Sequence, residues 1–254
     1  MSLKRGNSAV PRSLVFPAVV AVAVCACLIL AVVPGCGGGK EVSEKASAMT
    51  VEELWARAQE ADKDIRSWHM EIASYYENTQ YGSGQIQSII IDVNGEDIHE
   101  RDLLLGQVYS EYMRVGGKQY NKNMSSGIWE EVSPETPSDA AKEYSSQFLD
   151  LPSLSDSQTH VGTESIGGEE AERFHFVLGP EAVKTMFANQ PSFDFSQNSG
   201  GEVEVWIDGD EYYLLRYELV IRDVIIPEKI GKGDIRFVVN ISGINEPLEI
   251  EPPI

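Results

Sequence analysis

The amino-acid sequence predicts an α+β fold in which a few helices cover the concave face of a large, curved antiparallel sheet. Hydrophobic and polar residues alternate over many short segments that are separated by turn residues, which is typical of strands with one buried face. Three other segments carry an apolar stripe with a helical period. A sheet of roughly ten strands tends to curl, and helices on its concave face would enclose an apolar space.

Composition supports a globular protein and excludes some partners. The 254 residues are 42% hydrophobic and 24% charged, and 20 Lys and Arg stand against 40 Asp and Glu, for a net charge of -20. Such an acidic chain repels phosphate backbones, so nucleic acid is not expected as a partner. The same charge argues against docking on anionic lipid head groups.

Residues 1–35 have the pattern of a bacterial lipoprotein signal peptide. Three positive charges precede an apolar run over residues 14–33. The segment Val33-Pro34-Gly35-Cys36 that follows resembles a lipobox, which predicts cleavage between Gly35 and Cys36 and a diacylglycerol on the Cys36 sulfur. An uncleaved N-terminal anchor is the alternative, because 20 apolar residues can span a bilayer.

The cysteine content agrees with export and lipidation. Cys25 and Cys27 lie in the segment that cleavage would discard, and no cysteine follows Cys36, so the mature chain would have no disulfide. Cleavage would remove three positive charges and no negative ones, which changes the net charge from -20 to -23. Residues 36–49 are predicted to be the lipidated cysteine and a flexible Gly- and Ser-containing tether, and residues 50–254 the folded domain.

The first half of that domain predicts one helix and a meander of strands. Thr50 and Glu53 form a capping-box pattern before an amphipathic helix of about 17 residues. Alternation and β-branched runs then predict strands, and Ser138 predicts the start of another helix. The strands are expected at 70–74, 86–93, 108–115, 118–122 and 128–132, and the second helix at 139–149.

The second half repeats the pattern of strands. Gly167-Gly168 predicts a hairpin between strands at 160–166 and 171–178, followed by a short helix over 181–188. The turn-rich stretch 189–201 is expected to be a mobile flap. Asp208-Gly209-Asp210 predicts a turn between two further strands. These strands are expected at 203–207 and 213–221, with a last one at 235–241.

One face of these strands is the candidate ligand cavity. The residues expected to line it are Phe174, Phe176, Val205, Ile207, Tyr213, Leu215, Tyr217, Phe237 and Val239. A solid core would show the same alternation, so both interpretations stay open. Val205→Trp would be tolerated over a cavity, whereas in a packed core it would lower stability.

No catalytic or metal motif is present, so the chain is not expected to be an enzyme. The four histidines show no H-E-x-x-H pattern, no G-x-S-x-G elbow occurs, and Gly116-Gly117-Lys118 lacks the preceding glycine of a P-loop. Asp208-Gly209-Asp210-Glu211 lacks the later ligands of a calcium loop. No cofactor is expected, and no metal site. His175 is expected to point away from its neighbours Phe174 and Phe176, toward solvent or a hydrogen-bonding partner.

Several segments in this order resemble the LolA/LolB-like superfamily, and within it the actinobacterial lipoproteins of the LppX/LprG type. They are the lipobox, the first helix, G-I-W-E at residue 127, the Gly-Gly-Glu hairpin at residue 167, V-E-V-W-I-D at residue 203 and the closing I-N-E-P-L-E-I-E-P-P. The resemblance implies a half-open β-barrel whose hydrophobic cavity holds acyl chains, with no catalytic residues.

Two functions therefore remain. The first is a lipoprotein anchored on the extracytoplasmic face of the cell membrane that binds a lipid, glycolipid or lipid-modified protein for transport or chaperoning. The alternative is a sensor or regulatory domain on the same fold, in which an outer surface meets a protein partner and no lipid is transferred.

Overall fold

The computed structural model describes residues 49–133, 150–187, 194–195, 199–226 and 230–254. The chain divides into two units, Met1–Val32 and Val33–Ile254, and every described residue belongs to the second. No helix within the described ranges is long and apolar enough to cross a membrane. The helix expected at 139–149 and most of the flap expected at 189–201 lie outside the described residues.

Helix α1 (Val51–Asp62) begins where the sequence predicts it. The Thr50 hydroxyl accepts a hydrogen bond from the backbone N–H of Glu53, whose carboxylate accepts one from the backbone N–H of Thr50. This capping box satisfies two N–H groups that lack partners within the helix. The helix is about five residues shorter than expected, because the chain enters the sheet at Ser67 and places Trp68 in a strand.

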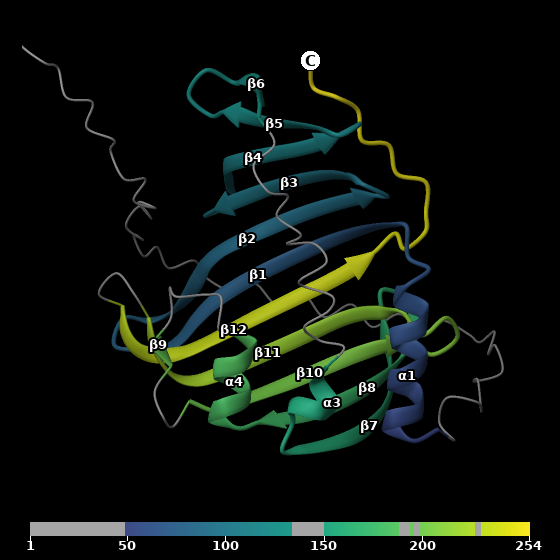
Figure 1. Ribbon diagram of the computed structural model, residues 1–254. Helices are drawn as coiled ribbons and strands as arrows, with labels where there is room; N and C mark the ends of the chain where they lie inside the picture. Colours follow the sequence, from purple (N-terminus) through teal and green to yellow (C-terminus); the bar gives the residue numbers. More distant parts are fainter. Residues whose placement is uncertain (1–48, 134–149, 188–193, 196–198, 227–229) are drawn as a thin grey trace, which may run out of the picture. The chain divides into compact units, whose positions relative to one another are not determined.

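The strands form one 12-stranded antiparallel sheet (Figure 1). They are β1 (Ser67–Thr79), β2 (Gly82–Asn94), β3 (Asp97–Leu104), β4 (Gln107–Val115), β5 (Lys118–Asn123), β6 (Ile128–Val132), β7 (Ser157–Ile166), β8 (Glu169–Leu178), β9 (Asp194–Phe195), β10 (Gly201–Asp208), β11 (Leu214–Ile226) and β12 (Gly231–Ser242). The spatial order is β6-β5-β4-β3-β2-β1-β12-β11-β10-β8-β7, and β9 pairs with β11. The pairing of β1 with β12 therefore joins an N-terminal half of the sheet to a C-terminal half.

The helices among the described residues lie on one face of the sheet, as the sequence predicts for helices and sheet. They are α1, α3 (Leu151–Leu154) and α4 (Pro180–Met186), and Figure 1 shows them in front of the C-terminal half. We call this the inner face. Each helix buries apolar side chains in the main hydrophobic core, among them Leu54, Leu151 and Val183. Helix α3 has no counterpart in the sequence prediction, because four residues are too few to show a helical period.

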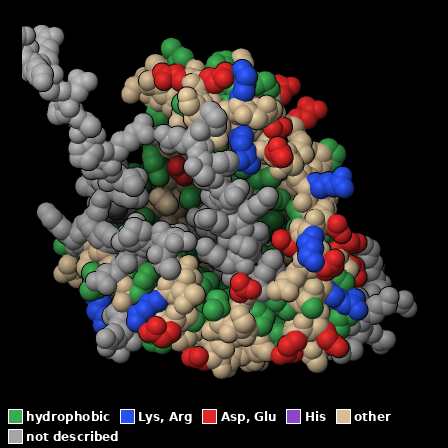
Figure 2. Space-filling view, viewed as in Figure 1, with side chains coloured by type: hydrophobic (Ala, Val, Ile, Leu, Met, Phe, Trp, Pro, Cys, Tyr) green, Lys and Arg blue, Asp and Glu red, His purple; other side chains and the backbone are tan. Residues whose placement is uncertain are grey.

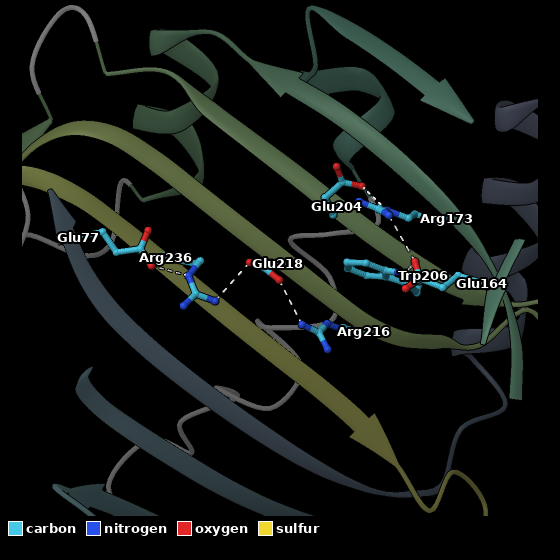
Figure 3. A network of polar contacts seen from close by, with 8 residues as sticks. All are labelled: Glu77, Glu164, Arg173, Glu204, Trp206, Arg216, Glu218 and Arg236. Carbon is cyan, nitrogen blue, oxygen red and sulfur yellow. Dashed lines mark hydrogen bonds and ion pairs between the residues drawn. The ribbon is translucent and has the colours of Figure 1, made fainter. Parts of the chain in front are cut away.

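An ion network crosses the opposite, outer face (Figure 3). The Arg236 guanidinium on β12 donates to Glu77 on β1, with 2.7 Å between Nε and Oε1, and to Glu218 on β11 at 3.3 Å. Arg216 donates to the second carboxylate oxygen of Glu218 at 3.1 Å. These contacts connect three neighbouring strands through half-buried side chains.

Trp206 continues this network on β10. Its ring lies between the guanidinium groups of Arg173 and Arg216, at 5.3 and 5.1 Å from the ring centroid, and its indole N–H donates to Glu164 at 3.0 Å. Arg173 also donates to Glu204 at 2.9 Å. Trp206 is thus buried on the outer face by its charged neighbours rather than by the main core.

The C-terminal segment after β12 runs back along the N-terminal half of the sheet (Figure 1). The Asn245 side chain accepts a hydrogen bond from the backbone N–H of Arg66 at 2.8 Å, and the Asn94 amide donates to the Leu248 carbonyl at 2.7 Å. Ile250 then packs against a second, small cluster on β4 and β5. The extended tail expected from the sequence is therefore held against the sheet.

Candidate functional site

A continuous apolar band crosses the inner face of the central strands. Met70 and Ile72 on β1 lie directly opposite Ile91 and Ile89 on β2, and Ile72 also lies opposite Val239 on β12. All five residues belong to, or pack against, the main core. They share one face because side chains alternate along a strand.

The inner face is hollowed beside this band. Figure 2 shows hydrophobic side chains inside the hollow, on the same side of the sheet as the helices. The described helices lie over the C-terminal half, and none of them lies over β3 to β6 (Figure 1). Ile86, Ile89 and Phe237 are only partly buried, although they pack against the core. The hollow therefore has an apolar floor that the described helices do not cover.

The structure brings six of the nine predicted cavity residues together in a closed part of the core. These six, with 0–2% of their surface exposed, are Phe174, Phe176, Val205, Ile207, Tyr217 and Val239. Val205 lies between Phe174 and Tyr217 on the neighbouring strands. Trp55 of α1 packs edge-on against Phe174 and Phe176, with ring centroids 6.2 and 5.0 Å apart. Here the inner face is packed against a helix.

The other three predicted residues lie differently. A β-bulge in β11 opposite Trp206 and Ile207 leaves Leu215 without a pairing partner on β10. As a result Leu214, and not Leu215, packs against the core, so the alternation expected from Tyr213 onward is interrupted. The Tyr213 hydroxyl accepts a hydrogen bond from the Asn245 amide at 3.3 Å.

Phe237 is the last of the nine predicted cavity residues. It is on β12, opposite Ser74 of β1, and it is partly buried. Its ring stacks on Phe187 just after α4, with centroids 5.8 Å apart. Phe237 thus stands between the packed part of the inner face and the hollow.

Two carboxyl groups on β3 join the inner face, and the sequence analysis did not identify them. Glu100 lies opposite Ile91, and Asp102 lies opposite Ile89. Burial, with a smaller contribution from the charge of Asp102, raises the pKa of Glu100 to about 7. Burial also raises the pKa of Asp102, against the effect of a hydrogen bond from Ser110.

Tyrosines from β4 complete this polar corner. Tyr112 lies opposite Glu100, and burial raises its pKa, with Arg114 acting in the opposite direction. Burial, followed by the charges of Asp102 and Glu100, raises the pKa of Tyr109. A protonated Glu100 and the neutral Tyr112 phenol are hydrogen-bond donors beside an apolar floor, whereas the Tyr109 hydroxyl donates to the Gln87 side chain at 3.4 Å. This combination suits an amphipathic ligand that has an oxygen-containing polar group.

The polar corner was missed because the sequence analysis did not predict β3. Its sequence, D-I-H-E-R-D-L-L, has charged residues on both faces and so lacks a clear apolar alternation. The available signal was Asn94-Gly95, the dipeptide most typical of a tight hairpin turn, directly after a β-branched run. A strand had to follow that turn, and its inner positions are Ile98, Glu100 and Asp102.

The histidines take part in side-chain pairs rather than a metal site. Each lies within 2.6–2.9 Å of a carboxylate oxygen: His69 of Asp92, His99 of Glu111, His160 of Glu172 and His175 of Glu204. The prediction that His175 points away from Phe174 and Phe176 is confirmed, because its partner Glu204 belongs to the outer-face network. Among the described residues no group of three or more His, Cys, Asp or Glu could hold a metal ion.

Comparison with solved structures identifies the fold. The lipoprotein LppX of Mycobacterium tuberculosis matches 80% of this chain and 100% of its own, with 17% identity and a TM-score of 0.51. LprF of Mycobacterium bovis matches 80% of this chain and 96% of its own, with 13% identity and a TM-score of 0.49. A LolA superfamily protein of Nitrosomonas europaea matches 80% of this chain and 96% of its own, with 9% identity and a TM-score of 0.28.

The chain has the LolA-like half-barrel fold of LppX, as the sequence resemblance implies. No protein-family model and no curated protein sequence matches it. At this level of identity the comparison establishes the fold, and the ligand has to be argued from the site.

Proposed function

We propose that this protein is a membrane-anchored, extracytoplasmic lipoprotein that binds the acyl chains of a lipid, glycolipid or lipid-modified protein in the hollow of its inner face. The observation that carries the proposal is the apolar band of β12, β1 and β2, which continues from a closed core under α1 into a hollow that the described helices leave uncovered. An apolar surface of this kind can take up acyl chains.

The energetics of acyl chains explain why a carrier needs such a hollow. Burying one methylene group is worth about 0.8 kcal/mol, so a 16-carbon chain needs on the order of 12 kcal/mol of favourable contact outside the bilayer. A long apolar surface supplies this without any chemical step. The donors of the polar corner, Glu100 and Tyr112, would meet the polar end of the same ligand.

The N-terminal segment belongs to the same proposal. Residues 1–35 act as a signal peptide, Cys36 carries the lipid anchor, and residues 36–49 tether the domain of residues 50–254 to the extracytoplasmic face of the cell membrane. Two or three acyl chains on one cysteine hold a protein stably, whereas one chain gives only marginal binding.

Organic extraction of the protein, purified from membranes in mild detergent, tests this function. Non-covalent lipid is released by the solvent, while a lipid on Cys36 stays with the polypeptide. We expect about one extractable ligand with acyl chains per protein molecule, identified by mass spectrometry. A folded protein that releases no lipid would favour the alternative, a regulatory domain that uses the sheet as a scaffold for a protein partner.

A further inference from the structure

Exposed hydrophobic side chains collect at one end of the sheet. Neighbouring strands are antiparallel, so the turns after β1, β3 and β5 lie at the same end, on the left in Figure 1. Eight large hydrophobic side chains are exposed among the described residues, and six of them lie in these turns or within three residues of this end of a strand. The six are Tyr81, Leu105, Tyr109, Met124, Ile128 and Ile225. We call the three turns, residues 79–82, 104–107 and 123–128, the rim.

Leu105 is a residue that the fold itself disfavours. It has a positive φ of 51° in the two-residue turn between β3 and β4, where Gly106 has a φ of 76°. Glycine or asparagine adopts this left-handed conformation more readily than a leucine does. The side chain is also 62% exposed, so it gains little from the core. Neither backbone conformation nor burial explains a leucine here.

The rim differs in charge from the turns at the opposite end of the sheet. The three turns of the rim contain no charged residue, in a chain with a net charge of -20. The turns at the opposite end, by contrast, are rich in carboxylates. These are Glu96, Asp97, Glu169, Glu170, Asp208, Asp210 and Glu211. Acidic side chains keep a surface hydrated and repel anionic phosphate groups, so the uncharged rim is better suited to contact with lipid than these turns are.

We propose that the rim docks on the surface of a lipid bilayer, with Tyr81, Leu105 and Ile128 inserted among the head groups. Tyrosine favours the membrane interface, and aliphatic side chains without nearby charges enter the boundary of the acyl region. A protein partner would bring polar groups of its own, and the rim has no charged side chain to pair with them. This favours a lipid surface over a protein partner. The inference concerns the surface that meets the membrane and does not depend on what the hollow carries.

Lipid-dependent quenching of a fluorophore tests the docking. The full chain, with Cys25→Ala and Cys27→Ala, is reconstituted into phosphatidylcholine vesicles that contain nitroxide-labelled lipid. A fluorophore is attached through Leu105→Cys or Ile128→Cys, and in matched controls through Val161→Cys or Ile254→Cys, two exposed hydrophobic positions away from the rim. The unsubstituted background corrects for any label on Cys36.

We expect the fluorophores at positions 105 and 128 to be quenched at least about threefold more than those at 161 and 254, because only the rim enters the bilayer. Equal quenching at all four positions, or none at 105 and 128, overturns the proposal.

A second set of variants separates docking from folding. With the fluorophore attached through Met124→Cys, the triple change Tyr81→Ser, Leu105→Asn and Ile128→Ser should abolish quenching without lowering the melting temperature, since these side chains are exposed. The matched change Val161→Ser and Ile254→Ser should leave quenching intact. Unchanged quenching in the triple variant contradicts membrane docking by the rim.

Discussion

Glu100 and Glu249 are carboxyl groups in different environments, because Glu100 lies on the inner face and Glu249 is exposed. Glu100 is drawn onto the apolar inner face by the register of β3 against β2, whereas Glu249 is exposed in the C-terminal segment. Removing the first from water raises its pKa to about 7. Its proton is therefore held at a pH at which most glutamates are charged.

The pH dependence of stability follows from this shift. Because the pKa of Glu100 is higher in the folded state than its usual value of 4.5, the folded protein binds more protons between about pH 4.5 and 7. Its contribution to the free energy of unfolding is thus greatest at acidic pH and is lost as the pH rises through that window. Glu100→Gln should remove this slope and raise the free energy of unfolding at pH 8 by about 1–3 kcal/mol.

Urea denaturation at several pH values measures this effect. Glu249→Gln serves as the control and should keep the wild-type slope, because this exposed side chain stays hydrated in both states. An unchanged slope in Glu100→Gln would show that the carboxyl group is not buried in the protein as described.

Cys36 is the predicted site of the lipid anchor. It would be the only cysteine of the processed chain, so Cys36→Ser should abolish the lipid mass increment and block normal cleavage after Gly35. Mass spectrometry of the N-terminal peptide measures both. Cleavage before residue 36 in the serine variant, or an unmodified Cys36 in the wild type, would contradict the anchor.

At the scale of elements, the C-terminal half of the sheet and α1 behave as a packed core. Val205 is fully buried between Phe174 and Tyr217, so Val205→Trp should cost about 1–3 kcal/mol and lower the melting temperature. Val220→Trp, on the outer face of the next strand, should be much better tolerated. A Val205→Trp protein with wild-type stability would mean that this region, too, holds an open cavity.

Sequence reasoning predicted the elements well where apolar alternation was strong. The capping box placed the start of α1, and the Gly167-Gly168 turn placed the β7–β8 hairpin. It failed where charged residues or a β-bulge interrupt the apolar alternation. The charged strand β3 was not predicted, and the bulge at Leu215 could not be recognised because a bulge is defined by pairing with another strand.

The candidate site was predictable only in part for the same reason. Six predicted residues do lie together on the inner face, but whether a face is packed or hollow depends on which helix covers it. Trp55 closes the region around Phe176, and no sequence pattern relates two residues so far apart. The polar corner required the β2–β3 register, which the missed strand concealed.

In the whole domain, the two halves of the sheet have different structural features. The C-terminal half forms a packed wall, with its helices on the inner face and the Arg–Glu network on the outer face. The N-terminal half supplies most of the apolar floor of the hollow, the polar corner and the whole rim. The pairing of β1 with β12 makes the two halves one continuous inner face.

Lipid occupancy of two neighbouring variants tests whether the inner face binds acyl chains. Ile89 faces the hollow and Ile90, the next residue of β2, faces the outer side, and both are partly exposed. After native purification and extraction, Ile89→Trp should lose most of the bound lipid because the indole occupies the space of the acyl chain, while Ile90→Trp should keep it, with both proteins folded. Equal lipid occupancy in the two variants, or none in the wild type, would contradict a lipid-binding inner face.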